Sequence, residues 1–421
     1  MSDRRLRRDV AWNLVPVVLL GAVGLGLNFL IAAWWGAAAL GVFNLVTITY
    51  FVFVVIGACG IQFSVLRAVA AHVEDRDQVA AIVLGALVPT VVIALATTGL
   101  FLLVRRPIAE LLGGDAIAEN MLWATPGLFC FAINKVLFGV VNGLRRMRTF
   151  AVYTSLRYLL IAAGLGIART TDVRADHLAV IWTFAEGTLL LVLLGDLLAT
   201  VKLVRGAGDW RRWTREHLDY GIRGVSATLL MEINAKLDIW MLGAAGVAKE
   251  LVGVYSLAAA LNEGATQLSV VVQNNLNPIV ARALAEPRFA EVEELAHRTR
   301  RWFVPLMALA CTIGATCFPV IVPRLVNNPV FHAGALPFAV LMAGLALASP
   351  YLAFNQILLM AGRPGWYTLF ISLVVGINFV ANVLLIPHFG LLGAALANAT
   401  AAVASALLTR RFARGRIGVK I

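Results

Sequence analysis

Apolar residues run along this chain in stretches of helical length, separated by short polar segments. Twelve such stretches can be marked off, and each is long enough for a helix to cross roughly 30 Å of hydrocarbon. Because they are rich in Leu, Ala, Val and Gly and do not alternate between apolar and polar residues, they predict helices rather than strands. We therefore expect an all-α fold, a polytopic membrane protein with twelve transmembrane helices. The stretches cover approximately residues 12–34, 42–66, 79–104, 120–144, 150–168, 178–201, 218–243, 252–281, 302–323, 334–360, 366–387 and 391–409.

Basic residues predict an orientation for these helices. Most of the Lys and Arg residues lie at the two termini and in every second loop, whereas the alternate loops hold few. Cytoplasmic loops of membrane proteins are enriched in Lys and Arg, so both termini are predicted to be cytoplasmic. The first apolar stretch is too long for a typical cleaved signal peptide, and we interpret it as an anchor that is retained.

Composition narrows the classes of function. The 421 residues are 60% hydrophobic and 14% charged, with a net charge of +12. No basic cluster falls in a soluble domain, so the charge is expected to attract anionic lipid rather than nucleic acid. The four cysteines lie in apolar stretches and have neither disulfide nor metal-ligand spacing, so no metal site is predicted. No GxxxxGK[ST] phosphate loop occurs, so no nucleotide cofactor is expected.

A short repeat predicts how the helices are organised. The sequence LGVFNL at 40–45 returns as VGVYSL at 252–257, an offset of 212 residues, which is about half of the chain. Each copy follows a short outer loop and opens an even-numbered stretch. This spacing predicts two six-helix lobes in parallel orientation, related by an axis along the membrane normal. The N-terminal lobe is expected at 1–201, a cytoplasmic linker at 202–217 and the C-terminal lobe at 218–421.

Ionisable residues interrupt several apolar stretches, where charges are costly and usually mark a functional site. Around a helix at 228–243, one face carries bulky apolar side chains and the opposite face carries the polar and charged ones. The stretch at 252–281 also has a polar face. Both faces are predicted to point into a polar interior. The candidate residues on these two stretches are Glu232, Lys236, Asp238, Glu263, Gln267 and Asn274.

Two cations in the first half of the chain are further candidates. Lys135 and Arg157 lie near the middle of their stretches, and neither has an acidic residue within four positions. Asn142 adds a polar group to the same interior. Two structural interpretations stay open: Glu232 and Lys236 have the i, i+4 spacing of an ion pair that only stabilises the helix. Asn residues in membrane helices also often bind a neighbouring helix.

Three segments, at 36–70, 237–263 and 378–401, resemble the polysaccharide flippase branch of the multidrug/oligosaccharidyl-lipid/polysaccharide exporter superfamily. Asp238, Gly253, Tyr255 and Gly393 are the positions at which its motifs match. The resemblance implies two six-helix lobes around a central cavity. It also implies movement of an undecaprenyl-diphosphate-linked oligosaccharide, a repeat unit of O-antigen, capsule or exopolysaccharide, from the inner to the outer leaflet of the bacterial inner membrane.

This function would give the candidate residues three roles, because an unpaired diphosphate and its sugars cannot cross hydrocarbon unaided. The cations expected to offset the diphosphate charge are Lys135, Arg157 and Lys236. The side chains expected to meet sugar hydroxyls are Asn142, Gln267 and Asn274. The carboxylates expected to exchange H⁺ or Na⁺ are Glu232, Asp238 and Glu263. Apart from such a coupling ion no cofactor is expected, and a polysaccharide polymerase is the expected protein partner.

Two other functions compete with this one. A multidrug cation antiporter of the same superfamily would use an acidic interior, and the interior carboxylates do outnumber the interior cations. A membrane-embedded glycan polymerase or ligase would need acid and base groups beside an acceptor site, usually with a large outer loop, whereas the outer loops here are short. Transport without enzymatic activity is therefore the expectation.

Overall fold

The structure is a computed structural model that describes residues 19, 21–203, 209–286 and 288–421. Within these ranges it is helical and contains no strand, as the apolar stretches predict. Nine helices in the same ranges are long and apolar enough to cross a bilayer, which makes the chain a multi-pass membrane protein. The first predicted stretch, 12–34, lies partly outside the described residues, and its described part is the helix Gly21–Trp35.

Packing divides the chain into two compact units. Among the residues that the structure describes, those within 1–27 and 42–233 form the first unit, and those within 28–41 and 234–421 form the second. Two helices, α2 (Ala37–Ala58) and α8 (Trp210–Ala244), contribute residues to both units. The lobes expected at 1–201 and 218–421 divide the chain elsewhere and stay a prediction.

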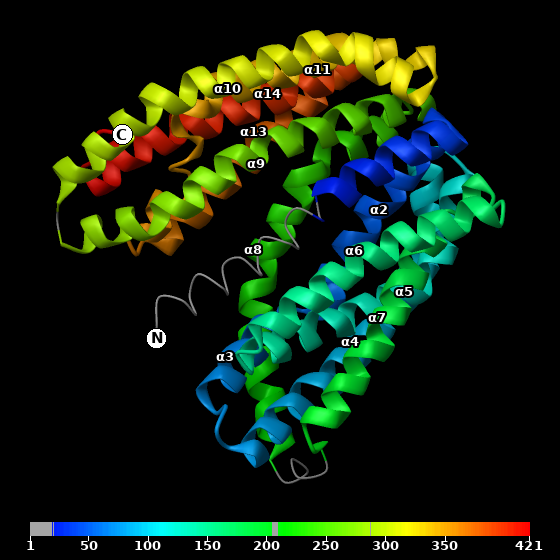
Figure 1. Ribbon diagram of the computed structural model, residues 1–421, viewed down its shortest axis with the longest axis vertical. Helices are drawn as coiled ribbons and strands as arrows, with labels where there is room; N and C mark the ends of the chain where they lie inside the picture. Colours follow the sequence, from blue (N-terminus) through cyan, green and yellow to red (C-terminus); the bar gives the residue numbers. More distant parts are fainter. Residues whose placement is uncertain (1–18, 20, 204–208, 287) are drawn as a thin grey trace. The chain divides into compact units, whose positions relative to one another are not determined.

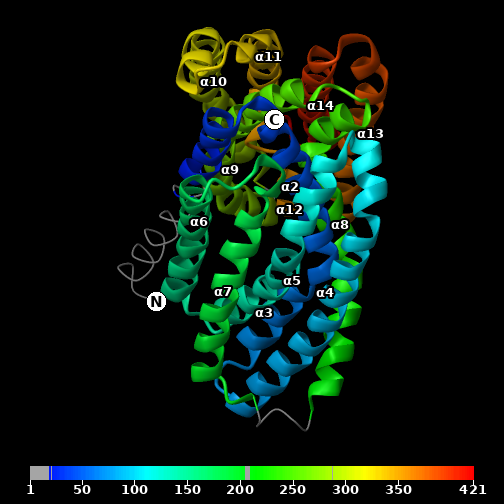
Figure 2. The ribbon, with the colours of Figure 1, turned by 90° about the vertical axis from the view of Figure 1, so that its right-hand side faces the viewer.

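In the first unit, α5 (Asp115–Gly143) is the central helix and packs against several others (Figure 2). Small residues let the backbones approach: a Cβ on Gly139 would lie 2.5 Å from the carbonyl oxygen of Gln62. Close backbone contact of this kind is how membrane helices gain dispersion energy without a hydrophobic driving force. The helices around α5 are α2, α3 (Ile61–Ala71), α4 (Arg76–Leu112), α6 (Met147–Thr170) and α7 (Val180–Thr200).

The continuous helix predicted at 42–66 is wrong, because the chain turns between α2 and α3. Cys59 and Gly60 have φ angles of 46° and 69°, in the left-handed region that ends a helix. Gly60 also lies against Gly221 of α8, where a Cβ would come within 2.8 Å of the Gly221 carbonyl oxygen. The residues around Gly60 are mostly apolar, so the sequence contains no signal that the helix ends there.

The predicted linker at 202–217 is also partly helical. Residues 204–208 lie outside the described residues, and α8 begins at Trp210, so the end of the linker is the first part of this helix. His217 of α8 is buried: its Nδ1 lies 2.8 Å from the Ser64 hydroxyl and its Nε2 lies 3.1 Å from the carbonyl oxygen of Ile82. These bonds attach α8 to α3 and α4.

In the second unit, α11 (Ala335–Leu352) and α14 (Leu391–Phe412) lie side by side (Figure 1). A Cβ on Gly344 would lie 2.5 Å from the Cβ of Ala399, so small residues again permit the contact. The helix predicted over 334–360 is split, because α11 ends at Leu352 and a separate turn, α12 (Ile357–Met360), follows. The remaining helices of this unit are α9 (Lys249–Ala285), α10 (Phe289–Val326) and α13 (Pro364–Phe389).

The two copies of the repeat meet at Gly41 and Gly253, where α2 crosses α9. A Cβ on Gly41 would lie 2.9 Å from the amide nitrogen of Gly253, and a Cβ on Gly253 would lie 3.0 Å from that of Gly41. The same substitutions would overlap the carbonyl oxygens of Lys249 and Ala37, respectively. Both pairs of residues are separated by the repeat offset.

Candidate functional site

A buried ion pair joins α6 to α7 in the first unit. Nε of Arg157 lies 3.0 Å from Oε1 of Glu186, and Nη2 donates to Oε2 at 3.2 Å. The Glu186 side chain has no exposed surface and that of Arg157 is 15% exposed. A charge at this depth is stable only when it is paired, so each residue depends on the other. Arg157, which has no acidic residue within four positions along the chain, therefore has its counter-charge on another helix.

Residues of α5 complete the surroundings of this pair. Asn134 donates from Nδ2 both to Oε2 and to the backbone oxygen of Glu186, each at 2.9 Å. The guanidinium of Arg157 lies 4.3 Å from the ring centroid of Phe131 and 4.9 Å from that of Phe138. Stacking on two rings adds cation–π attraction to the ion pair and holds the guanidinium in one orientation.

Lys135 follows Asn134 on α5 and is half-buried, with its Nζ 5.6 Å from the ring centroid of Phe131. It interacts electrostatically with Glu232 as well as with Arg157 and Glu186. No salt bridge to Lys135 is formed within the part of the chain that the structure describes. Its ammonium group is therefore the cation of this cluster that is best placed to receive a new anion.

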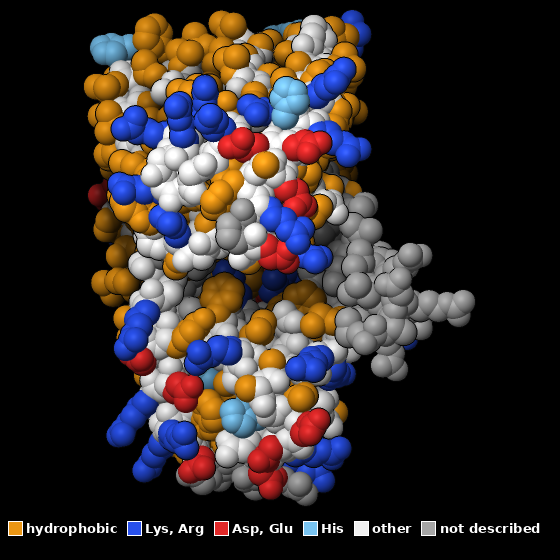
Figure 3. All heavy atoms as spheres, turned by 90° about the vertical axis from the view of Figure 1, so that its left-hand side faces the viewer, with side chains coloured by type: hydrophobic (Ala, Val, Ile, Leu, Met, Phe, Trp, Pro, Cys, Tyr) orange, Lys and Arg blue, Asp and Glu red, His pale blue; other side chains and the backbone are white. Residues whose placement is uncertain are grey.

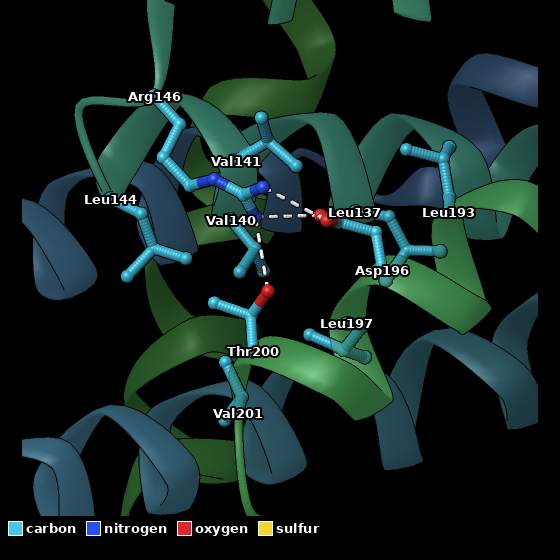
Figure 4. Close-up of a pocket in the computed structure, with 10 residues that line it drawn as sticks. All are labelled: Leu137, Val140, Val141, Leu144, Arg146, Leu193, Asp196, Leu197, Thr200 and Val201. Atoms are coloured by element: carbon cyan, nitrogen blue, oxygen red, sulfur yellow. Dashed lines mark hydrogen bonds and ion pairs between the residues drawn. The ribbon is translucent and has the colours of Figure 1, made fainter. Parts of the chain in front are cut away.

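A second ion pair fixes the end of α7 near the start of α6. Arg146 donates to both carboxylate oxygens of Asp196, at 2.7 and 2.9 Å, and to the Thr200 hydroxyl at 3.1 Å (Figure 4). These bonds raise the pKa of Arg146, chiefly through the hydrogen bond with Asp196. The cavity beside them has a volume of about 10 Å³, which is room for no more than about one water molecule. We interpret this pair as a structural clamp.

In the second unit, Asp238 lies in a closed hydrogen-bond cluster. The Tyr255 hydroxyl donates to its Oδ2 at 2.5 Å, Asn398 donates to the same oxygen at 3.1 Å, and the Ile239 amide donates to Oδ1 at 3.0 Å. Asp238 is 2% exposed and Tyr255 is fully buried. The cluster joins α8, α9 and α14, so two of the motif positions, Asp238 and Tyr255, are in contact.

Lys236 lies at a kink in α8, where its φ of −137° and ψ of 15° interrupt the helix. Its ammonium group forms an ion pair with Glu263 of α9 rather than with Glu232, its neighbour one turn away. The Lys236 and Glu263 side chains are 28% and 55% exposed. This pair is thus far more accessible than the Asp238 cluster.

None of the three polar candidates is buried. Gln267 and Asn274 are exposed on α9, and Asn142 is half-buried near the end of α5. Asn378 instead makes the interhelical contact that the structural interpretation of Asn residues predicts, because its Nδ2 lies 3.3 Å from Oδ1 of Asn234. The structure therefore groups Arg157 with Lys135 in one unit and Lys236 with Glu263 and Asp238 in the other.

Sequence reasoning did not include four residues of these clusters among its site candidates. They are Asn134, Glu186, Tyr255 and Asn398. Glu186 carried a signal as a carboxylate in the middle of an apolar stretch, and Tyr255 carried one as a motif position. Its partner Arg157 is 29 residues away along the chain, and no local spacing rule reaches that far. Within the described ranges, no group of His, Cys, Asp and Glu has the arrangement of a metal site.

Comparison with known proteins identifies a family and a fold. The sequence profile of the family described as "Polysaccharide biosynthesis protein" matches residues 6–293. No curated protein sequence matches the chain.

Solved structures resemble it over nearly its whole length. One is a multidrug resistance MATE family transporter of the MOP superfamily in an inward-facing conformation, with a TM-score of 0.79 and 14% identity, covering 96% of this chain and 98% of that one. Another is the lipid II flippase MurJ in an inward closed conformation, with a TM-score of 0.79 and 12% identity over 96% and 87%. A MOP superfamily transporter from Pyrococcus furiosus has a TM-score of 0.61 and 15% identity over 97% and 95%. At these identities the likeness shows a shared fold.

Proposed function

The chain belongs to the polysaccharide biosynthesis protein family, and from this premise we propose that it is a flippase for a lipid-linked oligosaccharide. It moves an undecaprenyl-diphosphate-linked repeat unit from the inner to the outer leaflet of the bacterial inner membrane. Family membership is the observation that carries the proposal. The fold that the chain shares with MurJ and with MATE transporters supports transport of the MOP type.

The proposal assigns the interior cations to the diphosphate. Burying that charge without a partner costs many kcal/mol, so the passage must present cations within a polar cavity. Lys135 is the principal contact, because Arg157 already has Glu186 as its counter-charge. Arg157 helps by offsetting the charge of Glu186, which also acts on Lys135. The positive charges of Lys135 and Arg157 are balanced by the carboxylates of Glu186 and Glu232, so the family match, and not charge alone, selects an anionic cargo.

The architecture proposed for this function has twelve helices in two lobes around the cavity, with both termini in the cytoplasm. The reciprocal contact of Gly41 with Gly253 supports a duplicated arrangement of this kind. Alternating access then follows from rocking of the lobes about a cavity that faces one leaflet at a time. Sugar hydroxyls would meet the polar side chains Asn142, Gln267 and Asn274.

Ion coupling is the least constrained part of the proposal. Among Glu232, Asp238 and Glu263, the last is the most accessible, and a proton or Na⁺ arriving there would compete with the Lys236 ammonium. Asp238 is buried and already accepts from three donors. We therefore place exchange first at Glu263 and assign Asp238 to holding α8 against α9 and α14.

Deletion of the gene tests the proposed cargo. The expected result is accumulation of one lipid-linked oligosaccharide on the cytoplasmic leaflet and loss of the corresponding polysaccharide outside the cell. Wild-type protein should reverse both effects, whereas K135A, at the same membrane abundance, should not. A deletion strain with a normal pool of lipid-linked oligosaccharides would contradict the proposal.

A multidrug cation antiporter is the second candidate, because a multidrug resistance MATE transporter matches the structure with the same TM-score as MurJ. In that case the exposed carboxylate of Glu263 would bind the cation. Drug sensitivity of the deletion strain separates the two functions. A flippase predicts unchanged sensitivity to organic cations, and an antiporter predicts increased sensitivity that E263Q fails to correct.

A further inference from the structure

A groove in the second unit lies between the start of α13 and the end of α14. Its volume is about 960 Å³, and its lining comes from these two helices and the turn that follows α14. That turn, Ala413–Ile417, is a single π-helical turn that ends at Gly418, whose φ is 88°. The groove therefore has a helical wall on each side and a short turn across its end.

The walls of the groove are apolar. Leu369 and Leu373 of α13 are 44% and 40% exposed, and Leu407 of α14 is 57% exposed. Beneath them, Phe370 and Val374 are buried in a small apolar cluster. Exposed leucines on helices that are apolar enough to span the bilayer face acyl chains, so the length of the groove is expected to lie in hydrocarbon.

The end of the groove is strongly basic. Arg410, Arg411, Arg414 and Arg416 all line it and are exposed, and its lining includes neither Asp nor Glu. None of the four forms an ion pair with any other residue that the structure describes. Arg416 lies 3.7 Å from the ring centroid of Trp366, which fixes its guanidinium at the mouth of the groove. Figure 3 shows the face of the molecule on which the C-terminus lies in Figure 1, and Lys and Arg side chains are common on that face.

The position of this basic turn is fixed by the last residues of the chain. Val419 is fully buried and Ile421 is 5% exposed, both in an apolar cluster with residues of α9 and α10. The Lys420 amide donates to Oε1 of Glu293 at 2.7 Å. The arginines are thus held beside the groove by packing and hydrogen bonding.

We propose that the groove binds an anionic phospholipid, with its phosphate among the arginines and an acyl chain along the leucines. Charge complementarity selects this occupant, because four unpaired guanidinium groups favour a phosphate that carries net negative charge. A soluble anion would leave the apolar walls unused, and a zwitterionic lipid would leave the arginine charge uncompensated. In the proposed orientation, the lipid belongs to the cytoplasmic leaflet.

Native mass spectrometry of the delipidated full chain in detergent tests the site. The probes are phosphatidylglycerol and phosphatidylcholine with identical acyl chains. Phosphatidylglycerol should bind at least tenfold more tightly, and R410Q/R414Q should weaken it about 30-fold, equivalent to about 2 kcal/mol. The matched control R298Q/R301Q removes the same charge from exposed positions of α10 and should change binding less than twofold.

Quenching of Trp366 fluorescence by brominated lipid tests the site in protein that keeps all four arginines. The signal is the difference between wild-type protein and W366F, and it should be larger with brominated phosphatidylglycerol than with brominated phosphatidylcholine. Equal binding of the two lipids, or equal loss in both arginine variants, would overturn the proposal. If soluble glycerophosphoglycerol displaced phosphatidylglycerol, the groove would be a site for anions rather than for a lipid. If a polyprenyl diphosphate bound more tightly than phosphatidylglycerol, the groove would be part of the substrate route. Either result would overturn it too.

Discussion

Replacing Glu186 with Gln is expected to destabilise the first unit by about 3–5 kcal/mol, because it leaves the Arg157 guanidinium buried without a counter-charge. The glutamine keeps the shape of the side chain and an oxygen that can still accept from Asn134. The loss is therefore one of charge. At the observed separation of 3.0 Å, the attraction is on the order of 5 kcal/mol with an effective dielectric constant of about 20. That value agrees with the expected penalty.

Equilibrium unfolding in mixed micelles, titrated with SDS and followed by tryptophan fluorescence, measures the effect. R157Q should cost a similar amount, and the double variant R157Q/E186Q should cost less than the sum, with a coupling energy of about 2 kcal/mol or more. D196N is the matched control, since it breaks the Arg–carboxylate pair with Arg146, whose side chain is 32% exposed. We expect a loss of about 1 kcal/mol there.

Two results would refute this reasoning. One is an E186Q protein as stable as wild type, which would mean that water or another group compensates Arg157. The other is strict additivity in the double variant, because two residues that depend on each other cannot act independently.

Three further variants test other parts of the fold. G253A should lose about 1–3 kcal/mol in the same unfolding assay, because its new Cβ would lie 2.9 Å from the carbonyl carbon of Ala37. Y255F should lose about 1–3 kcal/mol, because the buried Asp238 carboxylate loses a donor. Burial lowers the pKa of His217, so the unfolded chain binds its proton more readily than the folded protein does. Thermal stability should therefore fall as the pH drops below about 6.5, the unfolded value, and H217Q should reduce this pH dependence.

Each of these variants has a control or a contrary outcome. G376A, at a position where a Cβ would meet nothing within 4 Å, should be as stable as wild type. Equal losses of stability in G253A and G376A would contradict the argument that close backbone contact at Gly253 makes its substitution destabilising. A Y255F protein with unchanged stability would show that Asp238 does not need its donor. If the thermal stability of H217Q depended on pH as that of the wild type does, groups other than His217 would be responsible for the acid sensitivity.

The sequence was sufficient for the class of fold because the bilayer imposes it. Helical length and apolar composition follow from the thickness of the hydrocarbon, so most of the predicted stretches correspond to helices of the structure. The breaks at Cys59 and after Leu352 were not predictable in the same way. A glycine or a polar residue in an apolar stretch is tolerated within a helix, and only packing partners such as Gly221 decide whether the chain turns there.

The candidate site was predictable in part for a related reason. The cost of charge in hydrocarbon marked Arg157, Lys236 and Asp238 as residues that need partners. Their partners Glu186, Glu263 and Tyr255 lie on other helices, and i, i+4 spacing suggested the wrong neighbour for Lys236. Pairing across helices depends on rotation and depth, which periodicity alone does not define.

Translocation by purified protein in proteoliposomes tests the proposed function most directly. A fluorescent undecaprenyl-diphosphate-linked oligosaccharide is placed in both leaflets, and a membrane-impermeant quencher reports the fraction that exchanges. We predict rapid exchange with wild-type protein and at least tenfold slower exchange with K135A, whose fold is verified by unchanged SDS unfolding. Exchange no faster than in protein-free liposomes, or K135A activity equal to wild type, would contradict the assignment of this chain as a flippase that binds the diphosphate through Lys135.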